Sequence, residues 1–155
     1  MVIDDRFVLR GSVDLIEDRA DLDVLRVTDH KTGKNRSTPD LIVGGGAMLQ
    51  PVLYSVAVER ALGKKVAEGR LYYATTVGGF VDKPITINDY TRAQGIQVLE
   101  IVDRAIEMGF LAAAPSDRAC TWCDFRPVCG PREEERTRSK AKEPLADLKA
   151  LRSMR

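Results

Sequence analysis

The sequence predicts an α/β fold, and two observations support that prediction. First, two β-rich segments, residues 7–16 and 22–32, flank a short polar stretch and predict a β-hairpin. Second, apolar residues recur at helical spacing in residues 47–62 and 89–108, on either side of a β-branched and aromatic segment at 69–77. A length of 155 residues suits one domain, or one domain with a small appendage.

The hairpin is the first element along the chain. Its strands, FVLRGSVDLI and LDVLRVTDHKT, alternate roughly between apolar and polar residues, and the EDRAD stretch between them is compatible with a turn. Thr32-Gly33-Lys34 ends the second strand, and residues 35–43 are expected to form a loop. Two further strands are expected at 69–77 and 80–87.

Glycine and polar residues mark the predicted ends of the two helices. The first helix opens after the glycine run 44–46 and stops at Gly63, a residue that favours the conformation found just past a helix. Asn88 or Thr86 caps the second helix, which runs over 89–108. No internal repeat interrupts this order.

Composition and charge exclude several classes of protein. With 44% hydrophobic and 30% charged residues, the chain is not mostly disordered. It has 24 Lys and Arg against 23 Asp and Glu, a net charge of +1, so it is not a global polycation that grips nucleic acid by bulk charge. No apolar run approaches the ~20 residues of a membrane span, and no secretory signal follows Met1. We therefore expect a cytoplasmic protein that does not associate with a membrane.

The C-terminal part differs in composition from the rest. Residues 109–131 are rich in Pro and Cys and are expected to be irregular, and the tail from 132 to 155 is expected to be partly helical. Residues 116–155 hold ten Lys and Arg against seven Asp and Glu. This local excess favours a solvated helix face, with contact to a polyanion as the alternative.

Two acids and a lysine form the main candidate site. Asp14 is expected on the first strand of the hairpin, and Asp29 and Lys31 near the end of the second. Residues two apart on a strand share a face, so Asp29 and Lys31 project together, and hairpin pairing can bring Asp14 to the same side. Neighbouring carboxylates repel unless a cation such as Mg²⁺ or Mn²⁺ neutralises them. Such an ion, with a lysine beside it, is suited to phosphodiester hydrolysis.

A bare D-x-K at a strand end is usually a solvated edge, so its context matters. Asp29 and Lys31 follow the apolar stretch 24–27, which should lie in a core sheet. Lys31 is followed directly by Thr32-Gly33. This context favours a built site over a solvated edge.

These motifs resemble those of one enzyme family. Gly11-x-x-Asp14, Asp29-x-Lys31-Thr-Gly and Gln50-x-x-x-Tyr54 are similar to motifs of the PD-(D/E)xK nucleases, in particular the RecB-like branch with AddB-type nuclease domains and CRISPR-associated RecB-like exonucleases. The resemblance covers residues 11–130. It implies an α/β, restriction-endonuclease-like mixed sheet flanked by helices, with a nuclease core at 1–115 and a Cys-rich segment and charged helical tail at 116–155.

The resemblance also assigns roles to residues of the D-x-K site. Asp14 and Asp29 are the implied ligands of Mg²⁺ or Mn²⁺, with the backbone carbonyl of His30 as a further ligand. Lys31 is the implied catalytic lysine. The side chain of His30 should point away from Asp29 and Lys31 and serve packing or hydrogen bonding.

Gln50 and Tyr54 lie one helical turn apart and share a helix face. The resemblance implies that they contact DNA or support the metal site. The alternative is that Tyr54 packs in the core and Gln50 is a surface residue.

The cysteines Cys120, Cys123 and Cys129 form a C-x2-C-x5-C pattern that indicates Zn²⁺ or an iron–sulfur cluster more than ordinary buried cysteines. Both kinds of centre usually take four ligands. The resemblance implies a [4Fe–4S] cluster whose fourth cysteine precedes the nuclease core. That cysteine and the family's first helix have no counterpart here, so we expect an N-terminally truncated fragment, with a shortened member carrying an incomplete cluster as the alternative.

The sequence thus favours a metal-dependent DNA nuclease. The resemblance implies exonuclease-like hydrolysis in DNA repair, recombination or CRISPR-type DNA processing. Its expected partners are DNA and a helicase or nuclease-complex subunit, or further domains of a longer chain. Two alternatives stay open: a non-catalytic DNA-binding or scaffold module of the same fold, and a small zinc-binding interaction domain.

Overall fold

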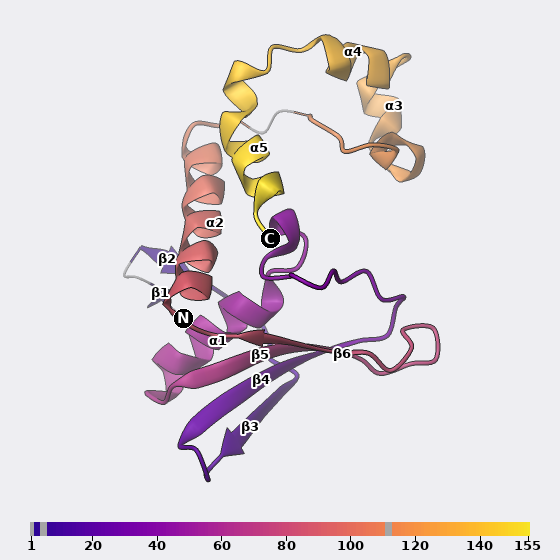
Figure 1. Ribbon diagram of the computed structural model, residues 1–155. Helices are drawn as coiled ribbons and strands as arrows, with labels where there is room; N and C mark the ends of the chain where they lie inside the picture. The colour runs from indigo at the N-terminus through magenta and orange to yellow at the C-terminus, as the bar shows by residue number, and fades with distance from the viewer. Residues whose placement is uncertain (1, 4–5, 111–112) are drawn as a thin grey trace.

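A mixed four-stranded sheet forms one side of the molecule, and the helices lie on its other side (Figure 1). The computed structural model describes residues 2–3, 6–110 and 113–155. The sheet order is β3 (Leu15–Arg19), β4 (Val24–Lys31), β5 (Val66–Tyr73) and β6 (Asp82–Thr86). The central pair β4 and β5 is parallel, and both outer pairs are antiparallel. The predicted α/β class with a mixed sheet and flanking helices is confirmed.

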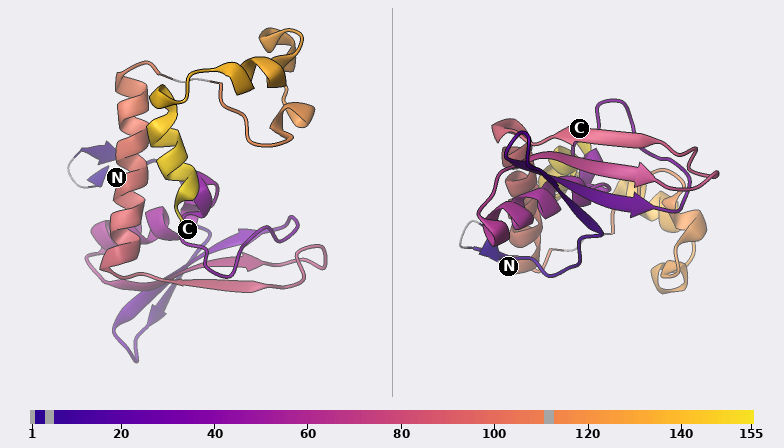
Figure 2. Two further views of the ribbon diagram at one scale, coloured as in Figure 1. Left: turned by 45° about the horizontal axis from the view of Figure 1, so that its top comes forward. Right: turned by 90° about the horizontal axis from the view of Figure 1, so that it is seen from below.

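Helix α1 (Gln50–Leu62) makes the crossover between the two parallel strands, and α2 (Asp89–Glu107) follows β6. Both helices lie on the same face of the sheet, and the right view of Figure 2 shows the strands in front with these helices behind them. The core fills the space between sheet and helices. Its buried members include Val27, Val52, Val66, Leu71 and Val98.

Glycine allows α1 to lie very close to β5. A Cβ built on Gly69 would stand 2.4 Å from the carbonyl oxygen of Pro51 and 3.0 Å from Oγ of Ser55. Ser55 in turn donates a hydrogen bond of 2.6 Å to that same carbonyl. Only a residue without a side chain fits here, so Gly69 fixes the height of α1 above the sheet.

Several predicted boundaries hold. The side chain of Asn88 accepts from the Thr91 amide at 3.0 Å, and the hydroxyl of Thr91 accepts from the Asn88 amide, which completes a capping box at the start of α2. Gly63 ends α1 at φ 62°, and its amide donates to the carbonyl of Glu59. Of the two predicted caps of α2, Asn88 is therefore the correct one.

The hairpin is confirmed, but its first strand is shorter than predicted. β3 begins at Leu15, so Asp14 lies just before the strand instead of on it. Residues 7–8 belong to a separate two-stranded ribbon, in which β2 (Phe7–Val8) pairs with β1 (Val2–Ile3). The structural reason is that the chain bends at Asp14. The Asp14 side chain then accepts the hydrogen bond from the His30 amide that the backbone of a longer β3 would accept.

Two other segments are displaced from their predicted positions. The glycine run forms a short 3-10 helix, η1 (Gly44–Gly46), with positive φ at all three residues, and α1 starts only at Gln50. The strand predicted at 69–77 runs from Val66 to Tyr73. The chain then makes a turn that reaches β6.

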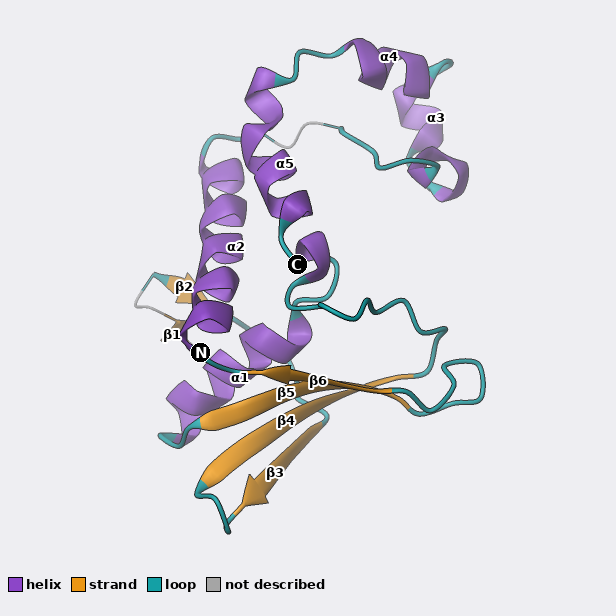
Figure 3. Cartoon of the chain, viewed as in Figure 1, coloured by secondary structure: helices purple, strands orange, loops and turns teal. Residues whose placement is uncertain are grey.

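The C-terminal part forms a lobe of short helices and then returns to the core (Figure 3). The lobe holds η2 (Ala119–Trp122), α3 (Arg126–Cys129) and α4 (Glu133–Ser139); η3 (Glu143–Leu145) leads into α5 (Ala146–Ser153). Arg104 of α2 binds Asp147 of α5 at 3.0 Å. The amides of Val43 and Gly44 both donate to the carbonyl of Arg155. No helix in the described part of the chain is long and apolar enough to cross a bilayer.

The sheet face opposite the helices carries a network of charges. Glu17 accepts two hydrogen bonds from Arg26, at 2.6 and 2.8 Å, and further bonds from Arg70 and Thr28. Arg70 also reaches Asp82 at 3.4 Å. The hydrogen bonds from Arg26 are the main reason why the pKa of Glu17 falls from 4.5 to about 2.

This network makes stability depend on acid pH. Because the pKa of Glu17 is lower in the folded chain, its contribution is present above pH 4.5 and is lost as the pH falls toward 2. In the parent, we expect the free energy of unfolding to fall between pH 6 and pH 2. Glu17→Gln should reduce that fall by on the order of 2 kcal/mol, measured by urea unfolding. The matched change Glu107→Gln, at an exposed position at the end of α2, should leave the parent's dependence unaltered. Parallel curves for Glu17→Gln and the parent would contradict the assignment.

The close contact between α1 and β5 predicts that one methyl group added at Gly69 lowers stability strongly. We expect Gly69→Ala to lower the free energy of unfolding by about 1–3 kcal/mol, because the new Cβ meets backbone that cannot move aside. Gly33→Ala is the control, since a Cβ at Gly33 has no neighbour within 4 Å. Urea unfolding of both variants beside the parent measures the difference. Equal stability of the two variants would show that α1 is free to shift.

Candidate functional site

The candidate site lies where β3 begins and β4 ends. Leu15 pairs with Thr28 across these strands, which places Asp14 beside the last residues of β4. Oδ2 of Asp14 accepts a hydrogen bond of 2.8 Å from the backbone amide of His30. The bend before β3 therefore holds the Asp14 carboxylate next to the residue that follows Asp29.

Asp29 is a buried carboxylate on the helix-covered face of β4. It continues the row of Leu25 and Val27, and the residue is only 7% exposed. Its Oδ2 atom lies 2.7 Å from Nζ of Lys31, yet the directions of the groups do not make a hydrogen bond, and this oxygen has no other polar partner within the described residues. A buried carboxylate oxygen with only an ion pair is costly and is suited to a further positive ligand.

His30 lies on the opposite face, as the alternation of a strand requires. Its ring packs edge-on against Tyr72, with ring centres 5.9 Å apart, and Nδ1 is 3.9 Å from Oδ2 of Asp14. The amide and carbonyl of one residue in a strand point toward the same neighbouring strand. Since the His30 amide meets Asp14, its carbonyl faces the same margin, where β3 has already left the sheet.

Gln50 and Tyr54 lie on the first turns of α1. Together with residues 9–11 they line a largely apolar hollow of about 300 Å³. Tyr54 is partly buried against the core, and a Cβ on Gly11 would lie 3.7 Å from its hydroxyl. Tyr54 is thus at the edge of the core, and both residues stand beside the segment that leads to Asp14.

The oxygen donors near the end of β4 are of the type that a hard divalent cation prefers. Asp14, Asp29 and the carbonyl of His30 offer only oxygen atoms, which Mg²⁺ and Mn²⁺ prefer. The observation that bears on this choice is the buried Oδ2 of Asp29, whose polar contact in the described chain is the Lys31 ammonium at 2.7 Å. No group of three or more His, Cys, Asp or Glu side chains gathers within the described residues, so backbone oxygen and solvent have to complete such a site.

The three cysteines lie apart from this site, in the C-terminal lobe. Cys129 lines one hollow of the lobe and Cys120 another, while Cys123 is exposed. Burial raises the pKa of the Cys120 thiol, and the charges of Glu133 and Glu134 raise it further. The three thiols do not form a metal-binding group in the described structure. The expected [4Fe–4S] cluster is therefore not supported.

Sequence reasoning missed the polar network beneath the site. Thr28 and Arg70 pair across β4 and β5, and Nε of Arg70 donates to the Thr28 hydroxyl at 3.0 Å. The signal was present in β4, where Arg26, Thr28 and His30 alternate with Leu25, Val27 and Asp29. A polar face on one side of a strand indicates that this side is not covered by an apolar helix.

Comparison with known proteins identifies the family. The sequence model of the PD-(D/E)XK nuclease superfamily matches residues 2–130. The chain belongs to the PD-(D/E)XK nuclease superfamily. No curated protein matches the chain. The superfamily match includes Asp14, Asp29 and Lys31, and it ends after the last cysteine.

A cation titration tests the fit of the site. We expect Mn²⁺ to raise the thermal unfolding midpoint of the parent, because an ion bound only to the folded chain stabilises it by mass action. Asp29→Asn should remove that shift, and Asp89→Asn, at a fully exposed position at the start of α2, should keep it. Each variant is compared with its own metal-free midpoint. An equal shift in Asp29→Asn and the parent would place the ion elsewhere.

Proposed function

We propose that this chain is a metal-dependent deoxyribonuclease domain that hydrolyses phosphodiester bonds. Membership of the nuclease superfamily supports nuclease activity, and the members of that superfamily generally use Mg²⁺ or Mn²⁺. The observation that carries the proposal is the buried Asp29 carboxylate, whose Oδ2 lies 2.7 Å from the Lys31 ammonium and lacks a hydrogen bond. A buried pair of opposite charges adds little to the stability of a fold, so stability is a weak reason for its presence at the end of β4.

Each residue of the site has a separate role in this proposal. Asp29, Asp14 and the His30 carbonyl hold the cation, which supplies Lewis-acid charge to the phosphodiester when bound. Asp29 holds Lys31 through its ion pair and keeps the ammonium at the end of β4. Lys31 provides a fixed positive charge beside the phosphate as negative charge develops on it.

Finer features of the proposal rest on the sequence motifs. The Asp29-x-Lys31-Thr-Gly and Gln50-x-x-x-Tyr54 patterns support assignment to the RecB-like branch, exonuclease-like action in DNA repair, recombination or CRISPR-type processing, and work beside a helicase or further domains. The position of Gln50 and Tyr54 beside the segment that leads to Asp14 supports a role for them at the edge of the site.

A scaffold module with the same fold is the second candidate. The 2.7 Å pair between Lys31 and Asp29 favours it, because the two charges already neutralise each other without a metal. In that case DNA is bound but not cut.

Comparison of two lysine variants separates the two candidates. We expect the parent to degrade DNA when Mg²⁺ or Mn²⁺ is added, and Lys31→Ala to lose at least about 100-fold in rate, because it lacks the charge beside the phosphate. Lys34→Ala, which removes an exposed lysine three residues away, is the matched control and should keep the parent's rate. The measurement is the initial rate of release of acid-soluble nucleotides.

The same assay defines the outcome that rejects the proposal. If the parent and Lys31→Ala release nucleotides equally, or if neither does while both bind DNA, the site is not hydrolytic. The scaffold candidate then explains the chain.

A further inference from the structure

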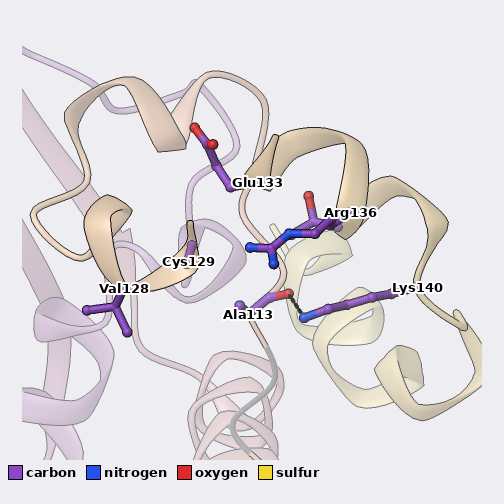
Figure 4. A pocket seen from close by; sticks show the side chains of 7 residues that line it. Ala113, Val128, Cys129, Glu133, Arg136 and Lys140 are labelled. Atoms are coloured by element: carbon purple, nitrogen blue, oxygen red, sulfur yellow. Dashed lines mark hydrogen bonds between the residues drawn. The ribbon is translucent and has the colours of Figure 1, made fainter. Parts of the chain in front are cut away.

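The hollows of the C-terminal lobe have an unusual lining. Three hollows of about 260 to 340 Å³ adjoin one another around Thr137, between residues 113–118, α4 and α5. The one against α5 is lined by four cations and no acid: Arg138, Lys142, Lys149 and Arg152. The next contributes Arg136 and Lys140, which Figure 4 shows extending together toward Ala113 and Cys129.

The acids that share these hollows are already neutralised. Glu133 is buried and pairs with Arg126 at 2.6 Å. Glu134 lies 3.7 Å from Arg138, and Asp117 lies 3.9 Å from Arg118. Among the cations that line these hollows, five have no carboxylate ion-pair partner within the described residues: Arg136, Lys140, Lys142, Lys149 and Arg152. We call the space that they line the basic cleft.

Their present contacts are to neutral groups only. Lys140 donates to the carbonyl of Ala113 at 3.2 Å, Lys142 to that of Thr137 at 3.2 Å, and Arg152 to that of Ala114. Three of the five positive charges bind carbonyl oxygens, and all five lie in exposed positions around neighbouring hollows, where they repel one another and attract a chain of anions.

Exposed aromatic side chains stand on the same lobe. Trp122 is 89% exposed and Phe125 is 74% exposed. Trp122 ends the short helix that begins at Ala119, and Phe125 precedes α3, whose Val128 and Cys129 line the cleft. A positive groove beside exposed aromatic rings is the combination that binds the backbone and the bases of a single strand.

We infer that the basic cleft binds single-stranded DNA through its phosphates, with Trp122 and Phe125 offering stacking surfaces for the bases. The occupant is DNA because the inference rests on the proposed function, which makes DNA the substrate. It is a single strand because the exposed rings of Trp122 and Phe125 can stack on unpaired bases, which a duplex keeps inside its own stack. The cleft and the D-x-K site then share one substrate but use different residues.

The test measures binding without catalysis. Anisotropy of a labelled oligo(dT) longer than about 16 nucleotides is followed in EDTA, so that no cleavage occurs. We expect the double variant Lys142→Glu and Lys149→Glu to bind at least about tenfold more weakly and to show a salt slope of log K shallower by about 1.4, since two phosphate contacts are lost. Both lysines are exposed, so the change spares the core.

A control variant separates a site from a general charge effect. Arg19→Glu with Lys65→Glu makes the same change in net charge at the far end of the sheet, and it should keep the parent's affinity and slope. Trp122→Ala should weaken oligo(dT) binding about tenfold and alter duplex binding less. Equal losses in the two double variants, unchanged binding in the cleft variant, or tighter binding of duplex than of oligo(dT) would each overturn the inference.

The two proposals fail in different ways. If the parent never cleaves DNA but the cleft variant still loses oligo(dT) binding, the nuclease proposal falls and the cleft stands. If Lys31→Ala abolishes cleavage while the cleft variant binds and cleaves as the parent does, the nuclease proposal stands and the cleft falls.

Discussion

The close approach of α1 to β5 is the constraint on which the rest of the fold depends. Because Gly69 has no side chain, the backbone at Pro51 rests almost on the strand, and the helix cannot slide without opening the core at Val52. This contact fixes where α1 begins relative to the ends of β4 and β5. It therefore sets the place of Gln50 and Tyr54 beside the segment that carries Asp14.

The sheet divides its two faces between different kinds of interaction. The helix-covered face is apolar except at its end, where Asp29 and Lys31 continue the rows of buried residues. The other face is held by Glu17, Arg26 and Arg70 without a covering helix in the described chain.

The sequence predicted the elements better than their ends. Local signals that act within a few residues were sufficient: the Asn88 cap, the Gly63 stop and the hairpin strands all appear near their predicted positions. Boundaries that depend on distant contacts were missed. β3 starts late because the Asp14 side chain binds the His30 amide, and α1 starts late because Gly44 and its neighbours turn to meet the end of the chain. The expected cysteine centre is not supported in the described residues, since spacing alone does not establish that thiols converge.

The latch between the glycine run and the chain's last residues has a mechanical consequence. The amides of Val43, Gly44 and Gly45 grip the carbonyls of Met154 and Arg155, so α5 is tied directly to the segment that enters α1. One wall of the basic cleft is thus joined through backbone hydrogen bonds to the segment that enters α1, the helix beside the D-x-K site. If both proposals hold, the fold itself sets the distance along a DNA strand between the phosphates bound in the basic cleft and the bond at the D-x-K site.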